Sequence, residues 1–107
     1  MKKILVLGAG AMGSAFTVPC VDNKNNVVLI GTHLEDDVIE NINNKNNFHK
    51  VLNCKLPKKL RVEKFLNFQE EIKKKPDLIV VAVSSKGVEW AGKEISKNYN
   101  STSAILL

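Results

Sequence analysis

Several features are scarce in this 107-residue sequence, and each one argues against a particular class of protein or site. One arginine stands among 16 basic residues and aromatic residues make up only 6%, whereas nucleic-acid-binding proteins need clustered arginines interleaved with aromatics. No window of about eighteen apolar residues occurs, so we expect no transmembrane helix and no stable membrane insertion. Cys20 and Cys54 lie far apart without a CxxC pair, which favours free thiols in the cytoplasm and argues against a metal site.

The charge comes almost entirely from lysine. The net charge is +5, and the lysines are dispersed among many asparagines rather than clustered. Lys73 to Lys75 form the one run, at the end of an expected helix, where cations favour the helix dipole. We therefore interpret the lysines as a solvated surface; an electrostatic funnel for an anionic ligand is the alternative.

Apolar runs alternate with helix-like segments along the chain. The expected strands are 3–7, 27–30, 60–65, 78–83 and 104–107, and the expected helices are 11–21, 38–44, 67–75 and 87–99. Parallel strands joined by right-handed crossovers are the economical solution for such a pattern. The sequence predicts an α/β fold: a doubly wound parallel sheet in three α-β-α layers.

Local signals set the expected ends of these elements. Pro19 should kink the first helix or end it early. Asp37 with Glu40, and Asn67 with Glu70, have the spacing of capping boxes. The asparagine-rich stretch 41–53 is interpreted as a solvated loop.

Three glycines, Gly8, Gly10 and Gly13, directly follow the first strand and open the first helix. This G-x-G-x-x-G spacing, in a strand–helix–strand context, predicts a dinucleotide site. Gly8 would permit a tight turn, Gly10 a close approach of the pyrophosphate, and Gly13 close packing of helix on strand. The amides of Ala11 and Met12 would face the phosphates at the positive end of the helix.

The choice between NAD and NADP rests on the end of the second strand. An acidic residue usually holds the ribose there, but this strand ends in Gly31, Thr32 and His33. The first acid is Glu35, which we expect to lie too far along the chain. Thr32 and His33 would not repel a 2′-phosphate, so the sequence leans mildly toward NADP. A surface histidine in a loop is the alternative for His33.

The fourth strand ends in Val83, Ser84 and Ser85. Ligands of open α/β sheets bind outside the carboxyl ends of the strands, at the switch point between the first and fourth strands. These three residues are therefore expected beside the cofactor. One of the serines is also expected to cap the helix that follows.

Other reactive side chains are assigned no catalytic role. Cys20 and Trp90 are interpreted as core residues, and His49 and the Glu70–Glu71 pair as solvated surface. No G-x-S-x-G elbow is present, so a serine hydrolase triad is not indicated.

Taken together, four segments resemble the N-terminal domain of NAD(P)-dependent glycerol-3-phosphate dehydrogenases. They are KILVLGAGAMGSAF, VVLIGTHLED, LPKKLRV and DLIVVAVSSKGVEWA. The resemblance implies a Rossmann-type fold and hydride exchange between NAD(P)H and dihydroxyacetone phosphate or glycerol 3-phosphate. It also implies a role in glycerophospholipid synthesis and a phosphorylated triose as the small-molecule partner; a homodimer stays open.

The same resemblance implies where the cofactor binds. Its pyrophosphate would be held by Gly8, Gly10, Ala11, Met12 and Gly13, its adenosine ribose would lie near Thr32 and His33, and its nicotinamide side near Val83, Ser84 and Ser85.

Two features depart from the family pattern. Many members have a proline where Ser84 stands, and the family's catalytic lysine would lie beyond Leu107. Because the sequence stops inside an expected strand, we expect residues 1–107 to be a dinucleotide-binding domain without its helical substrate domain. Such a chain would be catalytically inert. Another Rossmann dehydrogenase, of the ketopantoate reductase or 6-phosphogluconate type, and a non-catalytic dinucleotide-binding regulatory module are the alternatives.

Overall fold

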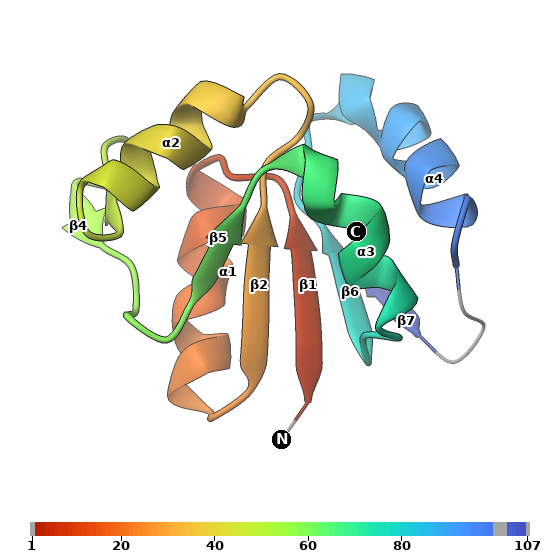
Figure 1. The fold of residues 1–107 in the computed structure, drawn as a ribbon, viewed down its shortest axis with the longest axis horizontal. Coiled ribbons are helices and arrows are strands. Elements are labelled where there is room, and N and C mark those ends of the chain that lie inside the picture. Colours follow the sequence, from red (N-terminus) through yellow and green to blue (C-terminus); the bar gives the residue numbers. More distant parts are fainter. Residues whose placement is uncertain (1, 100–102, 107) are drawn as a thin grey trace.

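Five parallel strands form the central sheet of the computed structural model, which describes residues 2–99 and 103–106 (Figure 1). The order across the sheet is β5-β2-β1-β6-β7. These strands are β1 (Lys3–Leu7), β2 (Asn26–Ile30), β5 (Arg61–Glu63), β6 (Leu78–Val81) and β7 (Ala104–Leu106). The chain starts in the middle of the sheet, builds one half outward and then returns to build the other. The predicted doubly wound topology is confirmed.

Four helices cover the two faces of this sheet (Figure 1). They are α1 (Ala11–Asp22), α2 (Asp36–Asn44), α3 (Phe68–Lys73) and α4 (Val88–Ser96). Alternate residues of each strand enter different cores: Ile4 and Val6 pack with Ile39 of α2, whereas Leu5 and Leu7 pack with Phe68 and other residues of α3 and α4. The predicted three α-β-α layers are therefore present, and none of the described helices has the length and apolarity needed to cross a membrane.

Several expected boundaries were wrong. Helix α1 continues three residues past Pro19 and ends at Asp22. Asn23, the residue after the helix, donates to the Pro19 carbonyl through both its backbone N–H and its side-chain amide. Helix α4 ends at Ser96 rather than Tyr99, and β6 ends at Val81. Leu107 of the last expected strand lies outside the described residues.

The expected side-chain caps do not form. Glu35, not Asp37, is the cap residue of α2, and Asn67 precedes α3 without capping it through its side chain. Ser84 precedes the short 3-10 turn Ser85–Gly87 and accepts the Gly87 N–H through its backbone carbonyl, not its hydroxyl. None of these three helix starts therefore has the side-chain cap that the sequence predicts.

The stretch 41–53, interpreted as a loop, begins in the last turn of α2 and forms most of a small hairpin. Strands β3 (Phe48–His49) and β4 (Cys54–Lys55) pair antiparallel, next to α2. Asn46, Asn47 and Asn53 adopt positive φ angles of 54°, 66° and 53° around it. Asparagine tolerates this left-handed region better than other side chains do, so the asparagine-rich composition supports turns here.

Glu71 also differs from expectation. Its carboxylate is buried and receives two hydrogen bonds from Arg61, of 2.9 and 3.1 Å, and one from Lys74 of 3.1 Å. Burial raises the pKa of Glu71, but these bonds outweigh burial and hold the pKa below its usual value of 4.5. Glu71 thus fixes α3 against β5, while Glu70 is exposed as expected.

Candidate functional site

A cleft of about 650 Å³ lies at the carboxyl ends of the central strands. In Figure 1 this is the edge toward which the arrowheads of β1 and β2 point. The cleft is lined by the glycine turn after β1, the turn after β2 and the segment after β6: Gly8, Gly10, Thr32, His33, Leu34, Glu35, Ala82, Val83, Ser84, Lys86, Gly87 and Trp90. Its volume suits a ligand-sized pocket, and the strand order places it at the switch point where the chain reverses direction across the sheet.

The fold requires a glycine at two of the three glycine positions, Gly8 and Gly13. Gly8 has a φ of +118°, and a Cβ there would lie 2.3 Å from the Ala82 carbonyl oxygen. A Cβ on Gly13 would lie 2.2 Å from the Gly8 oxygen. Both glycines are therefore needed by the fold itself, Gly8 for the turn and Gly13 for the approach of α1 to the turn, as expected.

Gly10 has no such structural reason. Its φ of −69° suits any residue, it is exposed, and nothing lies within 4 Å of the place where its Cβ would be. It stands directly before α1, where the unpaired amides and the positive end of the dipole favour an anion. A side chain at this position would fill open space above the cleft and block whatever approaches the backbone.

Glu35 lies at the end of β2, where no acidic residue was expected. The chain turns back after β2, with the Glu35 N–H donating to the Thr32 carbonyl at 3.0 Å. This turn brings the Glu35 carboxylate to the backbone amides of Thr32 (2.9 Å) and Ala9 (3.0 Å). The expectation that Glu35 lies too far along the chain was wrong, because a tight turn places it at the end of β2.

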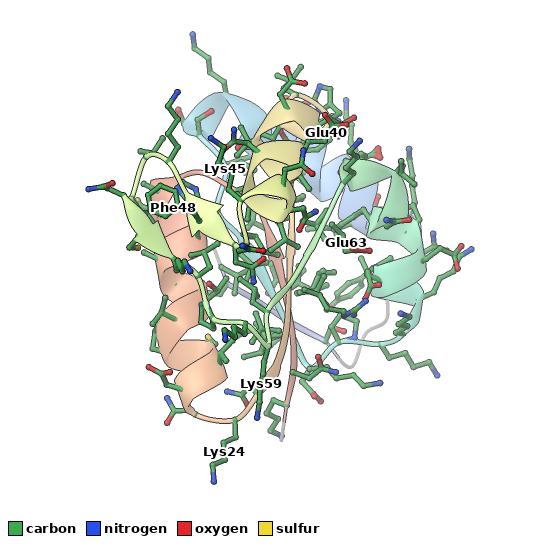
Figure 2. All side chains as sticks on the ribbon, turned by 60° about the vertical axis from the view of Figure 1, so that its left-hand side comes forward. Lys24, Glu40, Lys45, Phe48, Lys59 and Glu63 are labelled. Atoms are coloured by element: carbon green, nitrogen blue, oxygen red, sulfur yellow. The ribbon has the colours of Figure 1, made fainter. Side chains whose placement is uncertain are left out.

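His49 was also assigned wrongly. It is 2% exposed, and its Nε2 lies 2.9 Å from the Ala9 carbonyl oxygen, directly behind the glycine turn. Figure 2 shows its neighbour Phe48 on the hairpin beside α1. Sequence reasoning missed this contact because the two residues are 40 positions apart. The asparagines on either side of Phe48 and His49 were the sequence signal for turns in this segment, since asparagine tolerates positive φ angles.

Aromatic rings line one wall of the cleft. His33 lies against Trp90, with ring centroids 4.4 Å apart, and Trp90 in turn lies 4.9 Å from Phe65. Trp90 is half-buried and contributes to both the wall and the core, rather than to the core alone, whereas Cys20 is buried as expected. His33 is exposed on this wall, as the surface alternative had it, and faces the cleft as well.

The other predicted site residues fall into three groups. Val83 and Ser84 line the cleft. Ala11 and Met12 form the first turn of α1 beside it, with the Met12 side chain 85% exposed. Ser85 is exposed in the 3-10 turn and does not line the cleft.

Comparison with known proteins identifies the family of the chain. Residues 3–107 match the model of the family described as NAD-dependent glycerol-3-phosphate dehydrogenase N-terminus. The chain is 37% identical over 86 residues to an NADP(+)-dependent glycerol-3-phosphate dehydrogenase of Archaeoglobus fulgidus, covering 79% of this chain and 24% of that protein. It is 33% identical over 101 residues to a glycerol-3-phosphate dehydrogenase [NAD(P)+] of Bacillus pumilus, covering 94% and 27% respectively. The chain therefore spans about a quarter of the length of these relatives.

Two solved structures share the fold. A glycerol-3-phosphate dehydrogenase from Coxiella burnetii superposes with a TM-score of 0.82 at 18% identity, over 97% of this chain and 31% of that one. A putative 2-dehydropantoate 2-reductase from Enterococcus faecalis superposes with a TM-score of 0.67 at 25% identity, over 96% and 32%. The family match extends over nearly the whole sequence and both curated relatives carry the same enzyme name, so the chain belongs to the family of glycerol-3-phosphate dehydrogenase N-terminal domains.

Proposed function

We propose that the cleft binds a nicotinamide dinucleotide with its pyrophosphate on the glycine turn. The observation that carries this proposal is Gly10, a glycine with open space where its side chain would be and no backbone reason to be glycine. A cradle of this kind is what a phosphate needs in order to approach backbone amides closely. Gly8, Ala11, Met12 and Gly13 complete the turn, which agrees with the cofactor named for the family.

The remaining contacts follow from the shape of the cleft. Thr32 and His33 stand at the end of β2, where the adenosine ribose would lie, and Val83 and Ser84 stand on the nicotinamide side. Ser85, just outside the lining, would reach the cofactor only through its neighbours.

We infer that the cleft can bind either NAD or NADP. The lean toward NADP depended on the lack of an acid at the end of β2, and Glu35 supplies one. A carboxylate there favours ribose hydroxyls and repels a 2′-phosphate. The names of the relatives, NADP(+)-dependent in one case and NAD(P)+ in the other, support a site that accepts either cofactor.

The whole protein would exchange hydride between NAD(P)H and dihydroxyacetone phosphate or sn-glycerol 3-phosphate. When bound, the nicotinamide supplies or accepts the hydride, and this chain holds it in place. Residues 1–107 would form the N-terminal dinucleotide-binding domain, and a helical domain would bind the phosphorylated triose and supply the general acid. The activity would serve glycerophospholipid synthesis in the cytoplasm, with a homodimer as the oligomeric state to test first.

The test is calorimetric titration of the chain with NAD, NADH, NADP and NADPH. We expect at least one to bind, and binding to be lost in Gly10→Val. Steady oxidation of NAD(P)H by this chain with dihydroxyacetone phosphate would contradict the proposed division of labour. Failure of all four cofactors to bind at millimolar concentration would refute the cofactor site.

A further inference from the structure

The glycine turn is held from behind by side chains that come from three separate elements. The Ala9 carbonyl oxygen lies 2.9 Å from His49 Nε2 and accepts a hydrogen bond of 3.1 Å from the Ser14 hydroxyl. The N–H of the same residue donates to the Glu35 carboxylate at 3.0 Å. Ala9, His49 and Ser14 are all buried, so these bonds are shielded from water.

The direction of the bond to His49 follows from its second nitrogen. Leu52 donates its backbone N–H to His49 Nδ1 at 3.2 Å, so Nδ1 must be the unprotonated acceptor. The proton of the neutral ring is then on Nε2 and is donated to the Ala9 carbonyl. Both ring nitrogens are used, which fixes the orientation of the ring between the hairpin and the glycine turn.

The peptide that joins Ala9 to Gly10 links the contact with His49 to the cleft, because it fixes the direction of the Gly10 N–H. No cis peptide bond occurs among the described residues, and in a planar trans peptide the C=O and N–H point in opposite directions. When His49 and Ser14 hold the Ala9 carbonyl inward, the Gly10 N–H is aimed outward, on the side where Gly10 is exposed. That is the side from which a phosphate would approach.

We propose that His49 is a positioning residue for the cofactor site: through the Ala9 carbonyl it fixes the Gly10 amide in the orientation that receives the pyrophosphate. This inference rests on the proposed dinucleotide function. It gives the hairpin a role, since β3 carries His49 and the turn before β4 carries the Leu52 N–H that sets the ring tautomer.

Two substitutions of similar size separate this role from simple packing. His49→Gln places an amide NH₂ near the position of Nε2 and keeps a donor for the Ala9 carbonyl. His49→Asn places its oxygen near the position of Nδ1, keeps the acceptor for Leu52 and loses the donor to Ala9. Both remove the ring, so a role in packing alone would affect both alike.

The experiment measures NADH and NADPH affinity, through quenching of Trp90, together with the urea midpoint of each variant. Trp90 suits this purpose because it is the single tryptophan and lines the cleft. We expect His49→Asn to weaken binding about tenfold or more, as for one misaligned charge-assisted hydrogen bond, and His49→Gln to stay within about threefold of the unmodified chain. Equal affinities in all three proteins, or equal losses in both variants that follow their stability, would overturn the inference.

A second readout needs no cofactor. The exchange rate and NMR shift of the Gly10 amide should change in His49→Asn and be restored in His49→Gln. If the unmodified chain binds no dinucleotide, the proposed function fails, and this measurement still decides whether His49 orients the Gly10 amide. Should His49→Asn not fold, Ser14→Ala removes the other donor to the Ala9 carbonyl and is expected to shift the same amide; an unmoved Gly10 signal would then count against the inference.

Discussion

Substituting alanine for Gly10 separates the fold from the proposed cofactor site. The added Cβ has no neighbour within 4 Å and the φ of −69° is unstrained. Alanine is a poorer residue than glycine directly before a helix, by about 0.5–1 kcal/mol. The lower conformational entropy of the unfolded alanine chain offsets this by about 0.4–1 kcal/mol. We therefore expect the free energy of unfolding to change by less than about 0.5 kcal/mol.

Cofactor binding should respond quite differently. Without a side chain at position 10 a phosphate can lie directly over the Cα, whereas a methyl carbon there keeps each phosphate oxygen beyond roughly 3.4 Å from itself. The pyrophosphate must retreat and lose at least one charge-assisted hydrogen bond, worth about 1.5–3 kcal/mol. This predicts a ten- to hundredfold increase in the Kd for NAD(P)H.

Gly92 provides the matched control. It lies inside α4, and a Cβ there also has no neighbour within 4 Å. Gly92→Ala should raise stability by about 0.5–1 kcal/mol through helix propensity and leave the Kd unchanged. Calorimetric titration and urea unfolding of the three proteins give both quantities. If Gly10→Ala binds NAD(P)H as tightly as the unmodified chain, the assignment of the pyrophosphate to this turn is refuted.

Three further predictions address the charge at the site, the buried ion pair and the glycine packing. Glu35→Gln keeps an oxygen that accepts from Ala9 and Thr32 but removes the negative charge, so the NADPH-to-NADH affinity ratio should rise about three- to tenfold; an unchanged ratio in parallel titrations would mean that the carboxylate does not face the ribose. Glu71→Gln should lower the free energy of unfolding at pH 7 by about 1–2 kcal/mol, a modest value because its partner Arg61 is partly exposed. The folded pKa of Glu71 lies below its ordinary 4.5, so the stability that its charge contributes is present above pH 4.5 and is lost as the pH falls through the lower folded value. The urea midpoints of variant and parent should therefore converge in acid. A difference between the midpoints that stays constant with pH would exclude the ion pair as the source of the stability loss. Gly13→Ala forces a Cβ to 2.2 Å from the Gly8 oxygen and should cost about 3 kcal/mol by thermal unfolding, whereas a cost near zero would show that α1 can move away from the turn.

The arrangement of the sheet was predictable because it follows from local patterns. The run Leu78–Val81 is continuously apolar, as expected of a strand covered on both faces, and the glycine spacing marks the switch from β1 to α1. Right-handed crossovers then leave few choices for the strand order. Helix ends were predicted less well, because whether Asp37 or Glu35 caps α2 depends on the turn that precedes it.

The errors at the site share one physical cause. Glu35 and His49 were judged by their positions in the sequence, and each reaches the glycine turn through the path of the backbone. The turn after β2 returns Glu35 to the strand end, and the hairpin carries His49 across to Ala9. Glu71 is a similar case, since the sequence does not reveal that its carboxylate pairs with Arg61 of β5.

The sequence by itself determined the layered α/β fold and the place of the glycine turn, because both depend on short-range patterns of apolar residues and glycines. Only the tertiary structure decided which of the glycines the fold needs and which one is left for a ligand. It also decided that Glu35 binds the Ala9 N–H and that His49 binds the Ala9 carbonyl. Contacts between segments 26 and 40 residues apart depend on how turns aim the chain, and a side chain's chemical type does not encode that direction.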